Sequence, residues 1–353
     1  MAKRIAIMGA GAVGAYAGAH MAQAGEDVTF IDPWPEHVVQ MRTHGLHITG
    51  TTPEEEFTVK VKALHVTEAQ QIAKGAAIDI AFVCMKSYDT AWATMLISQY
   101  LAPGGFVVSL QNCMNEEQIA SIVGWGKTLG CIASSISVEL YDPGHVHRGV
   151  KKGGKAHTVF RVGEVHGRVT DRANDVCKLV AYGDSAMVTN NLWGERWSKL
   201  VANSMANGLS ASTGLSGNDM TANDTIRHFA TKLGSEAIRV GQALGYALEE
   251  ILHLPPETIA RAGEGDAAAL KIVDDQRFAE SKKRSGSQRP SMGQAMVKGR
   301  RPEIEFLNGF VCRKGEEVGI PTRANRALTD IVKRVERGEL KPDPKHITEL
   351  RLN

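Results

Sequence analysis

The segment "RIAIMGAGAVGAYAG", residues 4–18, decides the fold. Its first five residues are mostly apolar and predict a buried strand, and glycines in G-x-G-x-x-G spacing follow directly. In this spacing the first glycine permits a tight turn, the second lets the backbone approach a pyrophosphate, and the third lets helix and strand pack closely. The helix that begins here offers free N–H groups to phosphates. We expect a dinucleotide to bind along Gly9, Ala10, Gly11, Ala12, Val13 and Gly14.

An acidic residue ends the second predicted strand, "DVTFID" (27–32). Asp32 stands where a carboxylate accepts hydrogen bonds from the adenosine ribose hydroxyls. A 2′-phosphate beside this carboxylate would be repelled, and no basic residue follows before Arg42. The sequence therefore favours NAD over NADP. A structural glycine turn followed by a surface carboxylate is the competing interpretation.

The rest of the first half alternates strands with helices. Later strand candidates are "IDIAFVCMK" (78–86), "GGFVVSLQN" (104–112) and "GCIASSISVEL" (130–140). This alternation predicts a mostly parallel sheet covered on both faces. Lys86 and Asn112 come just past two strands, at the edge where open α/β sheets bind ligands. Either residue could equally be a turn former.

The second half reads as helices, with almost no strand from about residue 190. The predicted helices are 192–213, 221–246, 256–281, 302–318 and 322–337. The predicted fold class is therefore α/β, with an N-terminal Rossmann-type parallel sheet domain (1–190) followed by an all-helical C-terminal domain (191–353).

The stretch "RWSKLVANSMANGLSA" (196–211) opens the helical half. Lys199, Asn203 and Asn207 lie four residues apart, so on one continuous helix they share a face. An ammonium and two amides among small residues can bind a polar substrate. A solvated polar face is the alternative.

Composition excludes several function classes. Lys and Arg number 41 against 39 Asp and Glu, so no global field draws the chain to nucleic acid or anionic lipid. Five cysteines without a CxxC pair argue against a disulfide framework and a zinc site, and favour a reducing compartment. No run reaches the length of a membrane span. We expect a cytoplasmic protein without nucleic-acid, membrane or metal partners.

These motifs together resemble the ketopantoate reductase (2-dehydropantoate 2-reductase) family over nearly the whole chain. The segment "PSMGQAMVKGRRPEIEFLNGF" (290–310) looks like that family's Ser-Met, Gly-Arg, Glu-Ile and Asn-Gly signature. The resemblance implies an NAD(P)-dependent oxidoreductase that interconverts a small 2-keto acid and its 2-hydroxy acid. It also implies an active site between the two domains.

The resemblance assigns roles to single residues. Lys199 would be the general acid that protonates the keto oxygen, and Glu303 would lie near the nicotinamide and the lysine. Lys86 and Asn112 would contact the cofactor. The implied substrate contacts are Asn112, Asn203, Asn207, Asn218 and Ser291.

The chain departs from the family pattern near the nicotinamide. Cys113 stands where the family usually has glycine, and Asn115 where it often does. Substrate identity is therefore open, and an NAD-dependent dehydrogenase of another D-2-hydroxy acid competes with ketopantoate reduction. A nucleotide sensor without catalysis is a distant alternative, because a sensor needs neither Lys199 nor Glu303. The basic segment 282–289 is interpreted as a solvated loop, with phosphate binding as the alternative, and a homodimer through the helical domain stays open.

Overall fold

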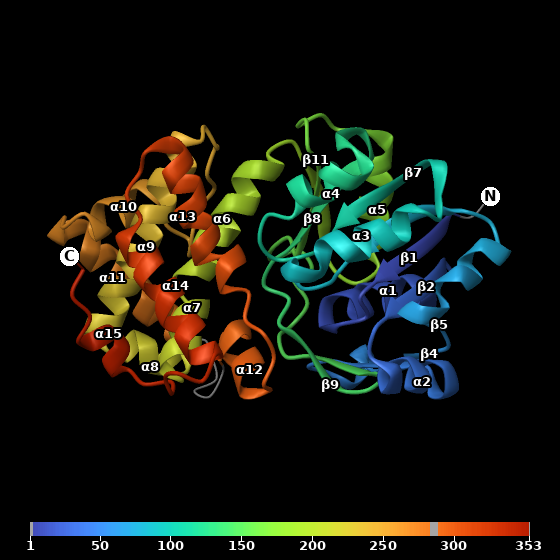
Figure 1. Ribbon diagram of the computed structural model, residues 1–353, viewed down its shortest axis with the longest axis horizontal. Helices are drawn as coiled ribbons and strands as arrows, with labels where there is room; N and C mark the ends of the chain where they lie inside the picture. The colour runs from blue at the N-terminus through green and yellow to red at the C-terminus, as the bar shows by residue number, and fades with distance from the viewer. Residues whose placement is uncertain (1–2, 283–288, 353) are drawn as a thin grey trace. The chain divides into compact units, whose positions relative to one another are not determined.

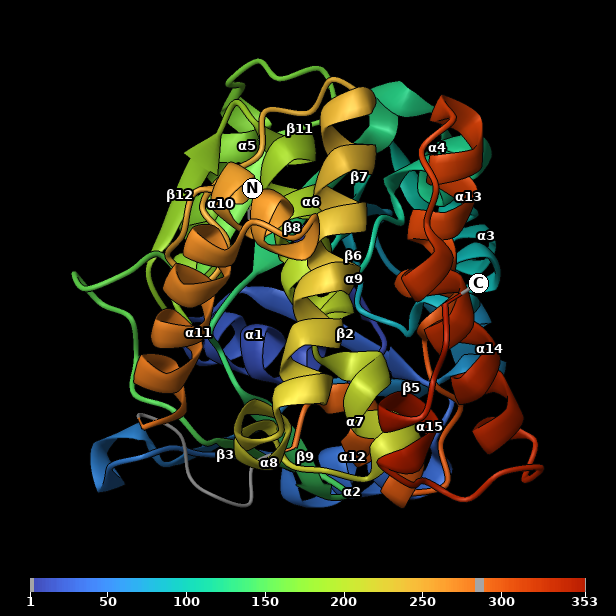
Figure 2. The ribbon, with the colours of Figure 1, turned by 90° about the vertical axis from the view of Figure 1, so that its left-hand side faces the viewer.

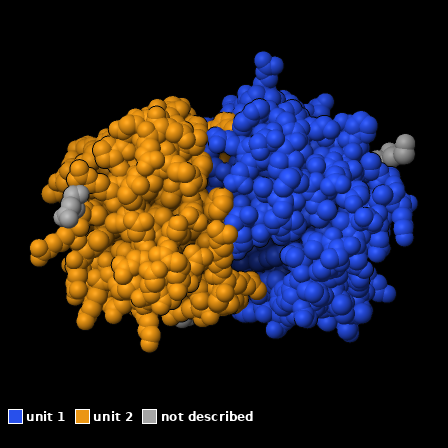
Figure 3. Space-filling view, in the orientation of Figure 1, with its two compact units in different colours: residues 1–192 blue, residues 193–353 orange. Residues whose placement is uncertain are grey.

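The computed structural model describes residues 3–282 and 289–352, so most of the basic segment 282–289 lies outside the described residues. The chain divides into two compact units, Met1–Leu192 and Trp193–Asn353 (Figure 3). The first contains a mostly parallel sheet, and the described part of the second is helical, which confirms the predicted fold class. Among the described residues, no helix is both long and apolar enough to span a membrane.

An eight-stranded sheet forms the centre of the first unit (Figure 1). Its order is β12-β11-β8-β7-β6-β1-β2-β5, and every pairing is parallel except that of β11 with β8. Around β1 this is the strand order of a doubly wound dinucleotide-binding sheet. The strands are β1 (Arg4–Met8), β2 (Asp27–Asp32), β5 (Lys62–His65), β6 (Ile78–Val83), β7 (Leu101–Ser109), β8 (Thr128–Ala133), β11 (Phe160–Glu164) and β12 (Ala186–Thr189).

Both faces of this sheet are buried, because alternate residues of β1 enter different cores. Ile5 and Ile7 pack in one core, with α1 (Ala12–Gln23) and α5 (Asp171–Ala181). Ala6 and Met8 pack in the other, under η2 (Val66–Lys74), α3 (Thr90–Ser98) and α4 (Glu116–Val123). Burial on both faces explains why the strands read as continuous apolar runs rather than alternating ones.

A second, four-stranded sheet in the order β4-β3-β10-β9 shares a core with α1. It consists of β3 (Leu46–Thr49), β4 (Phe57–Val59), β9 (Val138–Asp142) and β10 (His145–Arg148), with α2 (Pro35–His44) and η1 (Pro53–Glu55) nearby in sequence. The expected single element at 130–140 is wrong. Ser135 and Ser137 adopt positive φ angles of 54° and 39°. They turn the chain out of β8 and into β9 of the other sheet.

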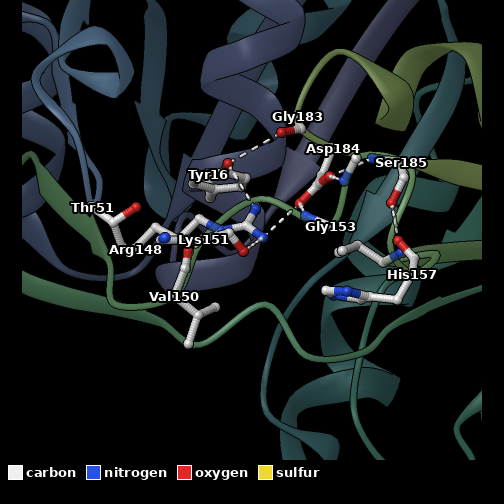
Figure 4. Close-up of polar contacts among 12 residues, drawn as sticks. Tyr16, Thr51, Arg148, Val150, Lys151, Gly153, His157, Gly183, Asp184 and Ser185 are labelled. Atoms are coloured by element: carbon white, nitrogen blue, oxygen red, sulfur yellow. Dashed lines mark hydrogen bonds and ion pairs between the residues drawn. The ribbon is translucent and has the colours of Figure 1, made fainter. Parts of the chain in front are cut away.

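A buried polar cluster ties α1 to the loops that follow β10 and α5 (Figure 4). The Arg148 guanidinium lies 2.5 Å from the Asp184 carboxylate and donates to the Tyr16 hydroxyl at 3.0 Å. Asp184 also accepts from the backbone N–H groups of Gly153 and Ser185 at 2.9 and 2.6 Å. The side chains of Arg148 and Asp184 are each only 1% exposed. Each charge is therefore stabilised by its protein partners rather than by water.

The second unit is built around α9 (Asp224–Ala243), which packs against α10, α13 and α14 (Figure 2). Its other helices are α6 (Leu192–Ser204, which begins in the first unit), α7 (Asn207–Thr213), α8 (Gly217–Ala222), α10 (Pro256–Gly263), α11 (Ala267–Ser281), α12 (Ser291–Val297), α13 (Asn308–Val318), α14 (Arg323–Glu336) and α15 (Lys345–Thr348), with η5 (Ile304–Phe306). The expected helix 256–281 is two helices. Helix α10 ends at Gly263, and Gly265, with φ +106°, lies between the two helices. The Asp266 side chain then caps α11.

Candidate functional site

The glycine-rich loop joins β1 to α1, and its glycines meet different constraints. Gly9 has φ +97°, and a Cβ there would lie 2.5 Å from the Met85 sulfur. A Cβ on Gly14 would lie 2.2 Å from the Gly9 carbonyl oxygen. A Cβ on Gly11 would meet nothing within 4 Å. Packing thus requires Gly9 and Gly14, whereas the space over Gly11 is open to a ligand that approaches the start of α1.

Both backbone groups of Ala10, inside this loop, are held by buried side chains. Its N–H donates to Asp32 Oδ2 at 2.7 Å, and its carbonyl oxygen lies 2.8 Å from His37 Nε2. The N–H of Gly144 donates to His37 Nδ1, so Nε2 carries the ring proton and donates to Ala10. Burial lowers the pKa of His37, which favours this neutral form. Asp32 therefore holds the loop as well as standing at the expected ribose position.

Lys86 follows β6, which neighbours β1 in the sheet, and Asn112 follows β7, which lies on the other side of β6. Four adjacent strands, β7, β6, β1 and β2, thus have Asn112, Lys86, Gly9 and Asp32, in that order, at or just beyond their carboxyl ends. This is the edge of an open α/β sheet where ligands bind.

Two buried amides, Gln111 and Asn115, neither of them expected to bind a ligand, cross-link the Lys86 and Asn112 loops. Gln111 Nε2 donates to the Met85 carbonyl oxygen at 2.8 Å. Asn115 Nδ2 donates to the Asn112 carbonyl oxygen at 2.8 Å and to Ser87 Oγ at 3.2 Å. The sequence shows only that both are polar residues shortly after a strand. It does not show which groups they bond.

Cys113, the family's usual glycine position, adopts φ +66° and is 5% exposed. This left-handed conformation costs an ordinary side chain about 1–2 kcal/mol, and glycine adopts it freely. The backbone thus keeps the shape that glycine favours although the residue has changed.

In the second unit, the expected continuous helix 192–213 is wrong. Helix α6 ends at Ser204, Met205 and Ala206 form a turn, and Asn207 begins α7. Lys199 and Asn203 remain four apart on α6, but Asn207 belongs to another helix, so helical spacing no longer places it on their face. Met205 at the turn is buried, and its sulfur fills the space over Gly234 of α9.

Several residues of the signature segment 290–310 contact the start of α7, directly after this α6–α7 break. Ser291, the first residue of α12, donates from Oγ to Asn207 Oδ1 at 3.3 Å. Gly293 lies against Ser210, where a Cβ would come within 2.3 Å of the hydroxyl oxygen. Ile304 packs on Gly208, where a Cβ would lie 2.9 Å from its Cδ1. The structure thus brings Asn207 and Ser291 together, although 84 positions separate them.

The remaining candidates of this unit lie at separate places. Glu303, 8% exposed, directly precedes η5 and thus neighbours Ile304. Asn218 lies in α8, and its buried Oδ1 accepts no hydrogen bond from the described residues. Within the described part of the chain, no hydrogen bond joins Asn218 to Asn207 or Ser291.

Two family models match most of the chain. Residues 5–158 match the family described as Ketopantoate reductase PanE/ApbA, and residues 191–336 match its C-terminal family. The chain belongs to the ketopantoate reductase family. The 2-dehydropantoate 2-reductase of Archaeoglobus fulgidus is 31% identical, over 95% of this chain and 99% of that protein. This family membership makes the chain an NAD(P)-dependent oxidoreductase that acts on CH–OH groups.

Solved structures show the same fold. A ketopantoate reductase from Ralstonia eutropha is 27% identical with a TM-score of 0.77, over 95% of this chain and 99% of that one. A D-mandelate dehydrogenase in complex with NADH and anilino(oxo)acetate has a TM-score of 0.78 at 21% identity, with the same coverage. The latter likeness concerns the fold alone.

Proposed function

We propose that this chain reduces the keto group of a 2-keto acid to the 2-hydroxy acid, with 2-dehydropantoate as the first candidate substrate. The observation that carries the proposal is the contact of Ser291 with Asn207 at the α6–α7 break, beside the helix that bears Lys199 and Asn203. Two polar side chains expected to hold substrate meet where the family signature crosses the break.

The first unit would hold the cofactor. The open space over Gly11 would admit the pyrophosphate at the start of α1, and Asp32 retains acceptor capacity for the ribose hydroxyls. Lys86 and Asn112 would contact the nicotinamide half. A bound dihydronicotinamide supplies the hydride.

The second unit would supply the proton and the substrate contacts. Hydride addition places negative charge on the keto oxygen, and the Lys199 ammonium would neutralise that charge and donate the proton. A carboxylate such as Glu303 near this ammonium would favour its charged form. Asn203, Asn207, Asn218 and Ser291 would bind the carboxylate and polar groups of the substrate.

Asp32 also supports a preference for NAD(H). Its buried carboxylate already accepts the N–H groups of Ala10 and Trp34 at 2.7 and 2.9 Å. These bonds fix a negative charge beside the ribose position, where a 2′-phosphate would be repelled.

A dehydrogenase of another D-2-hydroxy acid is the second candidate function, because Cys113 adds a side chain to the loop beside Asn112 where the family usually has glycine. A panel of 2-keto and 2-hydroxy acids, assayed with both cofactors through nicotinamide absorbance, tests the two. Highest kcat/KM on 2-dehydropantoate supports the first, and highest kcat/KM on a branched or aromatic D-2-hydroxy acid supports the second. Binding of NADH without turnover of any acid would contradict both.

A further inference from the structure

The carbonyl oxygen of Ser204 lies at the C-terminal end of α6, where the last carbonyls of a helix lack partners within the helix. Asn308 supplies a partner, since its Nδ2 donates to this oxygen at 3.1 Å. Ser204 and Asn308 are both fully buried, so water does not replace this bond. Asn308 therefore closes the end of α6 immediately before the turn that leads to Asn207.

A chain of buried groups fixes the orientation of the Asn308 amide. Its Nδ2 also donates to Asn325 Oδ1 at 2.9 Å. Asn325 Nδ2 in turn donates to Glu236 Oε2 at 2.9 Å and to the Leu233 carbonyl oxygen at 3.1 Å. Because Nδ2 faces two acceptors, a flipped amide would lose both bonds.

Glu236 anchors the far end of this chain. Its carboxylate, on α9, accepts the backbone N–H groups of Ala324 and Asn325 at 2.9 and 3.0 Å, at the start of α14. Negative charge at a helix N-terminus is favourable, and both bonds are buried. The network thus links α9, α14 and α13 to the end of α6, four elements of the same unit.

The other side of the Asn308 amide faces α7. Its Oδ1 is buried and accepts no hydrogen bond from the described residues. The same oxygen lies 3.2 Å from the point where a Cβ on Gly208 would stand. Asn308 therefore contacts both sides of the α6–α7 break, with an N–H bond to Ser204 and packing against Gly208.

We propose that Asn308 is a positioning residue for the reductase reaction, which acts by holding the α6–α7 break so that Asn207 meets Ser291. This inference rests on the proposed function, in which Asn207 holds the substrate. This role would account for the asparagine that follows Glu303 in the signature segment 290–310. Loss of the amide would let Asn207 move, while Lys199 stays on α6.

Asn308→Ala and Asn308→Asp test this role, with Ser235→Ala as the matched control. Ser235 is buried on α9 and donates to the Ala260 carbonyl oxygen at 2.8 Å, without a contact to the break. We expect both Asn308 variants to lose about 10- to 100-fold in kcat/KM at a temperature where they are folded, with NADH affinity unchanged. The control should lower only the thermal midpoint.

A double-mutant cycle separates positioning from stability. In an Asn207→Ala background, Asn308→Ala should cost less than about threefold in kcat/KM, because the residue through which it acts is gone. Full additivity of the two losses, or unchanged kinetics in the folded single variants, would overturn the inference.

Backbone hydrogen exchange tests the hold on the break without any substrate. Asn308→Ala should speed exchange at residues 205–209 beyond the effect of Ser235→Ala. Equal exchange in the two variants would overturn the inference. If the wild-type enzyme turns over no keto acid, the proposed function fails, whereas the exchange result still decides whether Asn308 holds the break.

Discussion

The Asp32 carboxylate accepts the backbone N–H of Ala10 at 2.7 Å, so one side chain links the end of β2 to the glycine-rich loop. The carboxylate thus holds the loop. We expect it also to discriminate against the 2′-phosphate of NADP(H). Substitutions that separate its charge from its acceptor function test this account.

Asp32→Asn should narrow the preference for NADH over NADPH, because the amide keeps one acceptor oxygen for the Ala10 N–H, gives up the bond from Trp34 and loses the charge that repels a 2′-phosphate. Asp32→Ala should narrow the same preference and weaken the binding of both cofactors, since the Ala10 N–H loses its hydrogen-bond acceptor. Calorimetric titration of NADH and NADPH into the three proteins measures this. Tighter wild-type binding of NADPH than of NADH would contradict the assignment.

The position of Cys113 predicts a contrast between two substitutions. Cys113→Gly should change the free energy of unfolding by less than about 1 kcal/mol and retain activity, because φ +66° suits glycine. Cys113→Val should destabilise by more than about 1–2 kcal/mol, since a β-branched side chain is strained at positive φ. Denaturant unfolding of both variants measures this. Equal stability would show that the backbone there relaxes freely.

The buried pair of Arg148 and Asp184 predicts a large stability effect. Arg148→Met should lower the free energy of unfolding by about 3–5 kcal/mol, because it leaves the Asp184 charge buried without its ion-pair partner. Lys62→Met is the control: it breaks the Lys62–Asp27 pair, whose lysine is 71% exposed, and should cost less than about 1 kcal/mol. Comparable losses in the two variants would refute the assignment of the buried pair.

His20 predicts a pH dependence of stability. Burial, together with the positive charges of Lys152 and Arg148, lowers the pKa of His20 from 6.5 to about 4. Below pH 6.5 the unfolded chain binds a proton that the folded chain excludes, so stability is lost from pH 6.5 down to about 4. The loss reaches about 1.4 kcal/mol per pH unit within that window.

His20→Phe should flatten this dependence, since a phenyl ring keeps the packing between Tyr16 and Phe57 and does not titrate. The same substitution at the exposed His44 should leave the dependence in place. Thermal unfolding at several pH values between 4 and 8 decides the matter. An unchanged slope in His20→Phe would contradict the assignment.

Local patterns predicted the sheet and the glycine loop because each feature depends on residues close in sequence. The apolar runs of β1, β2 and β6 and the glycine spacing follow from burial and turn geometry alone. The α6–α7 break could not be predicted in this way. "SMANG" carries no proline and keeps helical spacing, and Asn308, which donates to the Ser204 carbonyl oxygen at the break, lies 104 positions away.

The same limit applies to the site residues. The position of Asp32 followed from its spacing to the glycines, but its bond to Ala10 and the neutral His37 beneath the loop needed the fold. Ser291 and Asn207 were each expected to hold substrate, and only the packing of α12 on α7 brings them into contact. Gln111, Asn115 and Asn308 resemble ordinary polar residues until their buried partners are known.

Turnover of Lys199→Ala on the preferred keto acid tests the central claim most directly. If Lys199 donates the proton to the developing alkoxide, turnover should fall by about 10²–10⁴-fold, while NADH affinity, which we assign mainly to the first unit, should be retained. Lys199→Arg should not restore activity, because a guanidinium is a poor proton donor near neutral pH. Turnover of Lys199→Ala within about threefold of the wild-type value, far less than a positioned acid contributes, would show that the proton comes from another group.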